Sequence, residues 1–88
     1  MNKNTKQKWY ELSSLVLDLN SPSFHVFLRY SGHINTFDLS IHKGGWRKDD
    51  KGKSFERGEF ERNDMNSDVL QEAINWLCRE YESDKEEH

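Results

Sequence analysis

The chain has 88 residues, of which 33% are hydrophobic and 33% are charged, and its formal net charge at pH 7 is −3. This length supports one hydrophobic core and excludes a second. The sequence lacks both the run of roughly 18 apolar residues that a membrane span needs and the apolar core of a signal peptide, and its single cysteine, Cys78, excludes an intrachain disulfide. We therefore expect a single domain over residues 1–88 in a reducing, cytoplasmic compartment.

A first helix is predicted over about residues 5–19, with Asn4 or Thr5 as its cap. Its apolar residues recur every three or four positions and form one stripe: Trp9, Leu12, Leu15, Val16 and Leu19. Leu17 falls off this stripe. Asn20-Ser21-Pro22 should end the helix, because proline has no amide hydrogen and disfavours the α conformation in the residue before it.

From Phe24 the apolar residues alternate with a period of two, which predicts strands over about residues 23–30 and 34–47. A two-residue type II′ turn at Gly32-His33 would pair Leu28 with Phe37 and Val26 with Leu39, which places all these side chains on one face. The glycine pair Gly44-Gly45 suggests a bulge near the end of the second strand.

A third strand is predicted over about residues 53–61, after a tight loop at Asp49–Gly52. The last helix should span about residues 67–82, with Ser67 or Asp68 as its cap. Its apolar stripe consists of Leu70, Ala73, Ile74, Leu77, Cys78 and Tyr81. Residues 1–4 and 83–88 should fray. The expected fold is α+β in the order α-β-β-β-α, a three-stranded antiparallel meander packed on one face by two helices.

The loop between the second and third predicted strands, here called the second hairpin, is the strongest candidate binding site. Basic residues surround Trp46 there: Lys43, Arg47, Lys48, Lys51 and Lys53. Tryptophan and arginine are common anchors of protein interfaces, and His33 and Arg29 could extend the surface. Cations around an aromatic ring also suit nucleic acid. The alternative is a solvated hairpin with Trp46 folded back onto the sheet.

A second candidate is a polar cluster on the sheet face away from the core. There His25 would lie opposite Ser40 and diagonal to Asp38 and His42, a conceivable set of metal ligands. The spacing matches no recognised metal motif, and a solvated sheet face often carries such residues. We therefore expect no metal and no cofactor.

Catalytic signatures are missing from the sequence. It contains no phosphate-binding glycine loop and no order of residues typical of a serine hydrolase. Cys78 lies within an apolar stripe, which favours a buried structural thiol over a nucleophile. We expect no enzymatic activity.

The predicted topology resembles that of the double-stranded RNA-binding domain over residues 8–81, with sequence support from Gly32, His33, Phe37 and Gly44-Gly45. In that family a Gly-x-x-His element before the second strand probes the minor groove, which would assign that role to His33, although glycine and histidine are adjacent here. The family opens its second helix with Lys-Lys-x-Ala-Lys, whereas this chain has Asn66–Leu70, and Asp68 there repels phosphate.

The charge is unevenly distributed, because residues 64–88 hold 2 basic and 8 acidic residues. These carboxylates could contact a basic partner or simply serve solubility. In size and polarity the chain also resembles small accessory proteins of bacteriophages. The leading expectation is a non-catalytic interaction or regulatory protein that binds a protein partner through the second hairpin. The alternative is a nucleic-acid-binding module, and self-association is possible.

Overall fold

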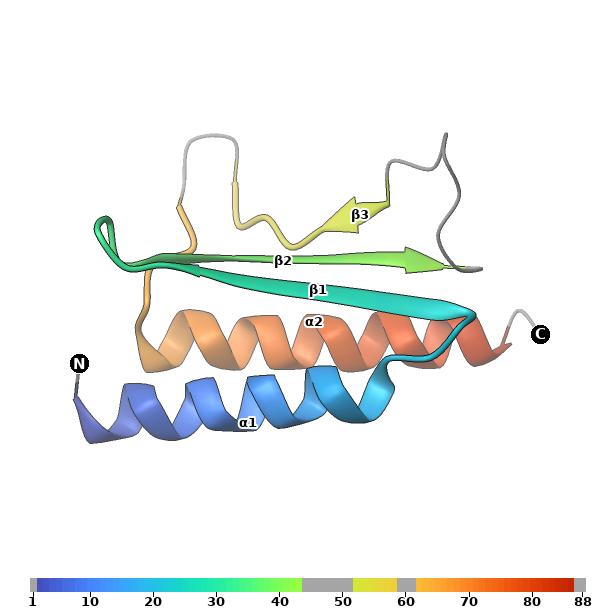
Figure 1. Cartoon of the computed structure of the whole chain (residues 1–88), viewed down its shortest axis with the longest axis horizontal. Coiled ribbons are helices and arrows are strands. Elements are labelled where there is room, and N and C mark those ends of the chain that lie inside the picture. The colour runs from blue at the N-terminus through green and yellow to red at the C-terminus, as the bar shows by residue number, and fades with distance from the viewer. Residues whose placement is uncertain (1, 44–51, 59–61, 87–88) are drawn as a thin grey trace.

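The structure, a computed structural model, describes residues 2–43, 52–58 and 62–86. The element order is α1 (Lys3–Leu19), β1 (Phe24–Ser31), β2 (Thr36–Lys43), β3 (Lys53–Ser54) and α2 (Ser67–Glu86). The strands form one antiparallel sheet in the order β1-β2-β3, and both helices lie on the same side of it (Figure 1). The predicted α+β class and the order α-β-β-β-α are therefore confirmed.

Helix α1 begins earlier than the sequence predicts. The side chain of Asn2 accepts a hydrogen bond of 2.8 Å from the backbone N–H of Thr5, so Asn2 is the cap. The predicted cap at Asn4 or Thr5 was wrong, and Thr5 is instead buried. The helix ends at Leu19 as expected. Leu17, predicted to lie off the apolar stripe, has 79% of its surface exposed.

The pairing of β1 with β2 differs from the prediction by two residues. Leu28 lies opposite Leu39 and Val26 opposite Ile41, because the turn contains four residues, 32–35, rather than two. Asn35 adopts a φ of 55°, a left-handed conformation that asparagine tolerates well. A shift of two residues keeps every side chain on its face, so the apolar pattern cannot distinguish the two registers.

The third strand is much shorter than the predicted 53–61. Only Lys53 and Ser54 form it, and the N–H of Phe55 adds a hydrogen bond of 2.8 Å to the carbonyl of Leu39. The chain then leaves β2 and returns at Asn63, whose carbonyl accepts a 3.0 Å bond from the N–H of Phe37. The second strand is predicted to reach residue 47; the structure describes it as far as Lys43, and residues 44–47 lie outside the described part of the chain. The proposed bulge at Gly44-Gly45 lies outside the described residues.

Helix α2 is longer than predicted. Its cap is Asn66, whose side chain accepts a 2.9 Å bond from the N–H of Val69, rather than Ser67 or Asp68. The helix continues to Glu86, so the prediction that residues 83–88 fray was wrong for 83–86. Asp84 is buried and the ammonium of Lys85 lies 4.9 Å from the centre of the Tyr81 ring, contacts that hold this last turn.

The core fills the space between the sheet and the two helices. Its fully buried large side chains are Phe24, Phe37, Leu12, Leu39, Ile41, Leu70 and Leu77. Phe37 lies at its aromatic centre, with ring centroids 6.3 Å from those of both Trp9 and Phe55. Cys78 is only half-buried, which differs from the buried thiol expected from its place in the stripe.

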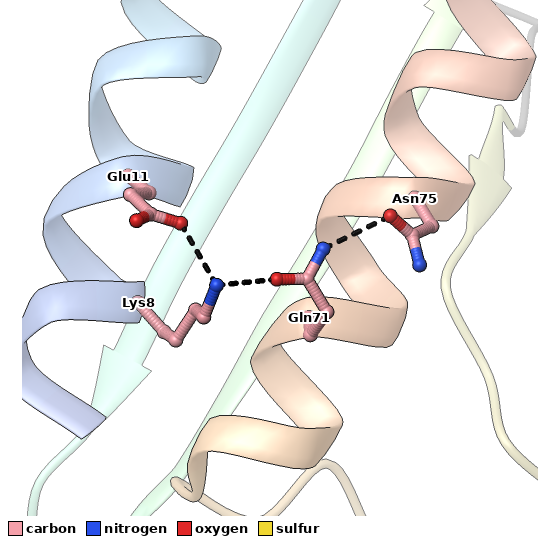
Figure 2. A network of polar contacts seen from close by, with 4 residues as sticks. All are labelled: Lys8, Glu11, Gln71 and Asn75. Atoms are coloured by element: carbon pink, nitrogen blue, oxygen red, sulfur yellow. Dashed lines mark hydrogen bonds and ion pairs between the residues drawn. The ribbon is translucent and has the colours of Figure 1, made fainter. Parts of the chain in front are cut away.

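A polar network joins the two helices on their side away from the sheet (Figure 2). The ammonium of Lys8 bonds to Glu11 at 3.2 Å and reaches across to the side-chain oxygen of Gln71. Gln71 in turn donates to Asn75 at 3.0 Å. These contacts link α1 to α2 where apolar packing ends.

Candidate functional site

The sheet face opposite the helices, here called the outer face, carries an exposed aromatic side chain on the edge strand β1. Phe27 on β1 is 47% exposed. Its ring meets two histidine rings edge to face, with centroids 6.4 Å from His25 and 5.5 Å from His42. His42 itself is buried, and a Cβ at Gly52 would lie only 2.6 Å from its Cε1. Gly52 therefore packs against the imidazole and holds it beside Phe27.

The stem of the second hairpin is tied to α2 by two lysines. Lys43 ends β2 and Lys53 begins β3, and the ammonium of each lies 3.1 Å from a carboxylate oxygen of Glu80. Burial raises the pKa of Glu80, but the hydrogen bonds and charges of the two lysines outweigh it and leave the pKa below its ordinary value of 4.5. The carboxylate is thus held ionised between two cations.

This arrangement changes the interpretation of the predicted binding residues. Lys53 is exposed, but its charge is compensated by Glu80. Trp46, Arg47, Lys48 and Lys51 all lie in 44–51, outside the described residues. Of the basic residues assigned to the hairpin, Lys43 and Lys53 therefore serve as a structural anchor.

The two residues expected to extend the site lie away from the hairpin stem. His33 is exposed in the β1–β2 turn, at the opposite end of β2 from Lys43 (Figure 1). Arg29 is on the outer face, where it forms an exposed ion pair of 3.1 Å with Asp38. Only Arg29 shares a face with Phe27, so the predicted surface is not continuous through His33.

The possible metal cluster does not form. His25 lies opposite His42 rather than Ser40. Asp38 precedes His42 by four residues on β2 and is paired with Arg29. Within residues 2–43, 52–58 and 62–86, no three histidine, cysteine or acidic side chains come close enough to hold a metal ion. The two-residue difference in register separates the proposed ligands.

A cavity of about 560 Å³ lies beside β2, between residues 54–56 on one side and 62–63 on the other. Its charged lining is balanced, with two basic and two acidic side chains: Arg29, Arg62, Asp38 and Glu56. Serine, threonine and asparagine side chains form most of the remaining polar lining. The cavity thus offers hydrogen bonds without a strong preference for either sign of charge.

Sequence reasoning missed Phe27 and Glu80 as site residues. Phe27 did carry a signal, because it is an aromatic residue at the alternate positions that β1 otherwise fills with His25 and Arg29. Glu80 carried none. Glu80 is one of many carboxylates on an acidic helix, and what distinguishes it is the tertiary packing that brings Lys43 and Lys53 close to it.

Comparison with models of protein families, with curated proteins and with solved structures finds no match to this chain. The fold defines it as a small two-layer α+β protein, in which neither helix of the described residues covers the outer face of the sheet. None of the helices in the described part of the chain is long and apolar enough to cross a membrane.

Replacing Glu80 with glutamine should lower the free energy of unfolding at neutral pH by about 1–2 kcal/mol, because two lysines lose their counter-charge. The folded-state pKa of Glu80 is depressed, so its contribution is complete above 4.5 and is lost as the pH falls through the lower folded value. The difference between wild type and variant should therefore shrink in acid. Urea unfolding at neutral and acidic pH measures both effects.

The matched control is Glu82→Gln, an exposed carboxylate on the same helix, which should change stability little at either pH. A pH-independent deficit in Glu80→Gln would contradict the ion-pair role.

Proposed function

We propose that this chain is a small non-catalytic interaction protein that binds a protein partner through the outer face and the adjoining second hairpin. The observation that carries the proposal is the exposure of Phe27 on the sheet face opposite the helices. Aromatic residues, phenylalanine included, are enriched at protein interfaces. Phe27 and His42 also lie toward the strand end from which the hairpin bearing Trp46 departs.

Charge compensation favours a protein over a nucleic acid as the partner. Nucleic-acid affinity depends on cations that are free to replace counterions along the phosphate backbone. Here Lys43 and Lys53 share the carboxylate of Glu80. At the N-terminus of α2, where the helix dipole would otherwise favour an anion, the negative charge of Asp68 in the first turn repels phosphate. The nucleic-acid alternative, with its resemblance to the double-stranded RNA-binding domain, is therefore the weaker proposal.

The proposed activity is regulatory and cytoplasmic, in the manner of the small accessory proteins of bacteriophages that the chain resembles in size and polarity. The single cysteine suits a reducing compartment. Binding without catalysis suits a face whose main feature is one aromatic ring between two imidazoles.

Phe27→Ala and Trp46→Ala should each weaken partner binding by about tenfold or more while leaving the helical circular-dichroism signal unchanged. Affinity capture from cell lysate followed by mass spectrometry would identify the retained protein, and titration would measure its affinity. The matched control is Ile34→Ala, which removes a similarly exposed apolar side chain, 46% exposed, at the far turn.

Nucleic-acid binding is tested in parallel by fluorescence anisotropy with labelled duplex RNA, duplex DNA and single strands at low and physiological salt. Micromolar binding that weakens steeply with salt would replace the protein-partner proposal. Equal retention of the captured protein by wild type, Phe27→Ala and Trp46→Ala would reject this surface as the binding site.

A further inference from the structure

The free edge of β1 is blocked over its first half by the α1–β1 connection. Ser21 exchanges two backbone hydrogen bonds with Phe24, of 3.0 and 3.2 Å. The side-chain amide of Asn20 then imitates a neighbouring strand. Its oxygen accepts a 3.0 Å bond from the N–H of Val26, and its nitrogen donates a 3.0 Å bond to the carbonyl of Val26.

The second half of the same edge is open. In an antiparallel strand the N–H and C=O of one residue point to the same side, and successive residues alternate. The backbone N–H and C=O groups of Phe24 and Val26 point away from β2, and the same groups of Leu28 and Tyr30 therefore point away from it as well. No hydrogen bond to these four outward groups is formed within the described part of the chain. A protein normally protects such a row of groups or uses it for pairing.

An apolar flank of α1 lies beneath this open edge. Residues three or four positions apart share one side of a helix. Leu17 is three residues before Asn20, and Trp9 is eight residues before Leu17. The Trp9 ring lies 5.8 Å from that of Tyr30, and Asn20 reaches Val26, so this row of residues runs along β1. Leu17 is 79% exposed and would be covered by an added strand.

We propose that the β1 edge from Leu28 to Tyr30 binds an extended peptide segment of another protein by strand addition. A second copy of this chain does not fit. Neighbouring strands lie about 4.8 Å apart, whereas packed helices need about 8–10 Å. Since α1 packs against β1 below the sheet (Figure 1), two copies paired along this edge would bring their α1 helices into the same space.

The surroundings of the edge define the chemistry of the peptide. Side chains that point toward the helices would lie over Trp9 and Leu17 and should be apolar. The alternate side chain on the outer face would lie beside Arg29, whose side chain is 79% exposed. Its ion pair with Asp38 is solvent-exposed and therefore weak, so an incoming carboxylate can share the guanidinium. The partner segment thus alternates apolar residues with at least one acidic residue.

The test is selection of peptides from a random display library on the immobilised full chain, followed by titration of a synthetic copy of the enriched peptide. Enriched sequences should alternate apolar and acidic residues. Tyr30→Pro removes an outward N–H that takes no part in pairing with β2, and it should weaken binding by about tenfold or more. Glu82→Gln, which alters an exposed side chain of α2 away from β1, should leave the peptide affinity unchanged.

Hydrogen exchange in the unsubstituted protein gives a second measurement that needs no variant. In the free protein the amides of Leu28 and Tyr30 should exchange faster than that of Val26, which Asn20 protects, and peptide should slow both by about tenfold or more. Failure to enrich any peptide, equal affinity for Tyr30→Pro, or no protection of these amides would overturn the proposal. Peptide affinity lost only in Phe27→Ala would also overturn it and would assign binding to the outer face.

Discussion

Replacing Gly52 with alanine is expected to lower the free energy of unfolding by about 2–4 kcal/mol, a large fraction of the stability of a chain this size. Gly52 has a φ of +70°, which costs other residues about 1–2 kcal/mol. A Cβ there would also lie 2.6 Å from the carbonyl oxygen of Ile41, a backbone atom of β2 that cannot rotate away. The pairing of β3 with β2 should therefore loosen, and urea unfolding would measure the loss.

Gly32→Ala is the matched control for this substitution. The nearest atom that its Cβ would meet is Cε2 of Tyr30 at 3.5 Å, an ordinary contact with a side chain. Its stability should change by less than about 1 kcal/mol. If both alanine variants were equally stable, the close packing of Gly52 on His42 and β2 would not support the hairpin stem.

The fold class followed from periodicity because the apolar stripes of the helices and the alternation of β1 and β2 each admit one element type. The register between β1 and β2 did not follow from periodicity, because the predicted and the observed pairing put the same side chains on the same face. The turn decided between them. Asn35 can adopt the left-handed conformation, which allows a four-residue connection in place of the predicted Gly32-His33 turn.

The candidate site was less accessible to sequence reasoning because it depends on tertiary contacts. The lysines and arginine of the hairpin suggested a free basic surface. In the fold, however, Glu80 of α2 lies beside Lys43 and Lys53, although it is far from both in the sequence. The edge of β1 is another case. That Asn20 ends a helix was predictable from Asn20-Ser21-Pro22, but its pairing with Val26 requires the connection to fold back along the strand.

Phe37→Ala is expected to have the largest effect on stability, about 3–5 kcal/mol. Phe37 is 1% exposed and its ring contacts Trp9 of α1 on one side and Phe55 on the other. Its removal leaves a cavity where three parts of the chain meet. A domain of this length has a total stability of roughly 4–13 kcal/mol, so the variant should be partly unfolded at moderate temperature. Thermal and urea unfolding, followed by circular dichroism, would measure the change.

Phe27→Ala makes the comparison decisive, because it deletes the same side chain from the neighbouring strand but on the outer face. Phe27 lies on the outer face and is 47% exposed, so its loss should cost less than about 1 kcal/mol of stability. If Phe27→Ala stays folded while Phe37→Ala is destabilised, the two phenylalanines have different roles, Phe37 in holding the fold and Phe27 in the proposed interface. Equal destabilisation would mean that Phe27 is part of the core and would remove the observation on which the proposed interface rests.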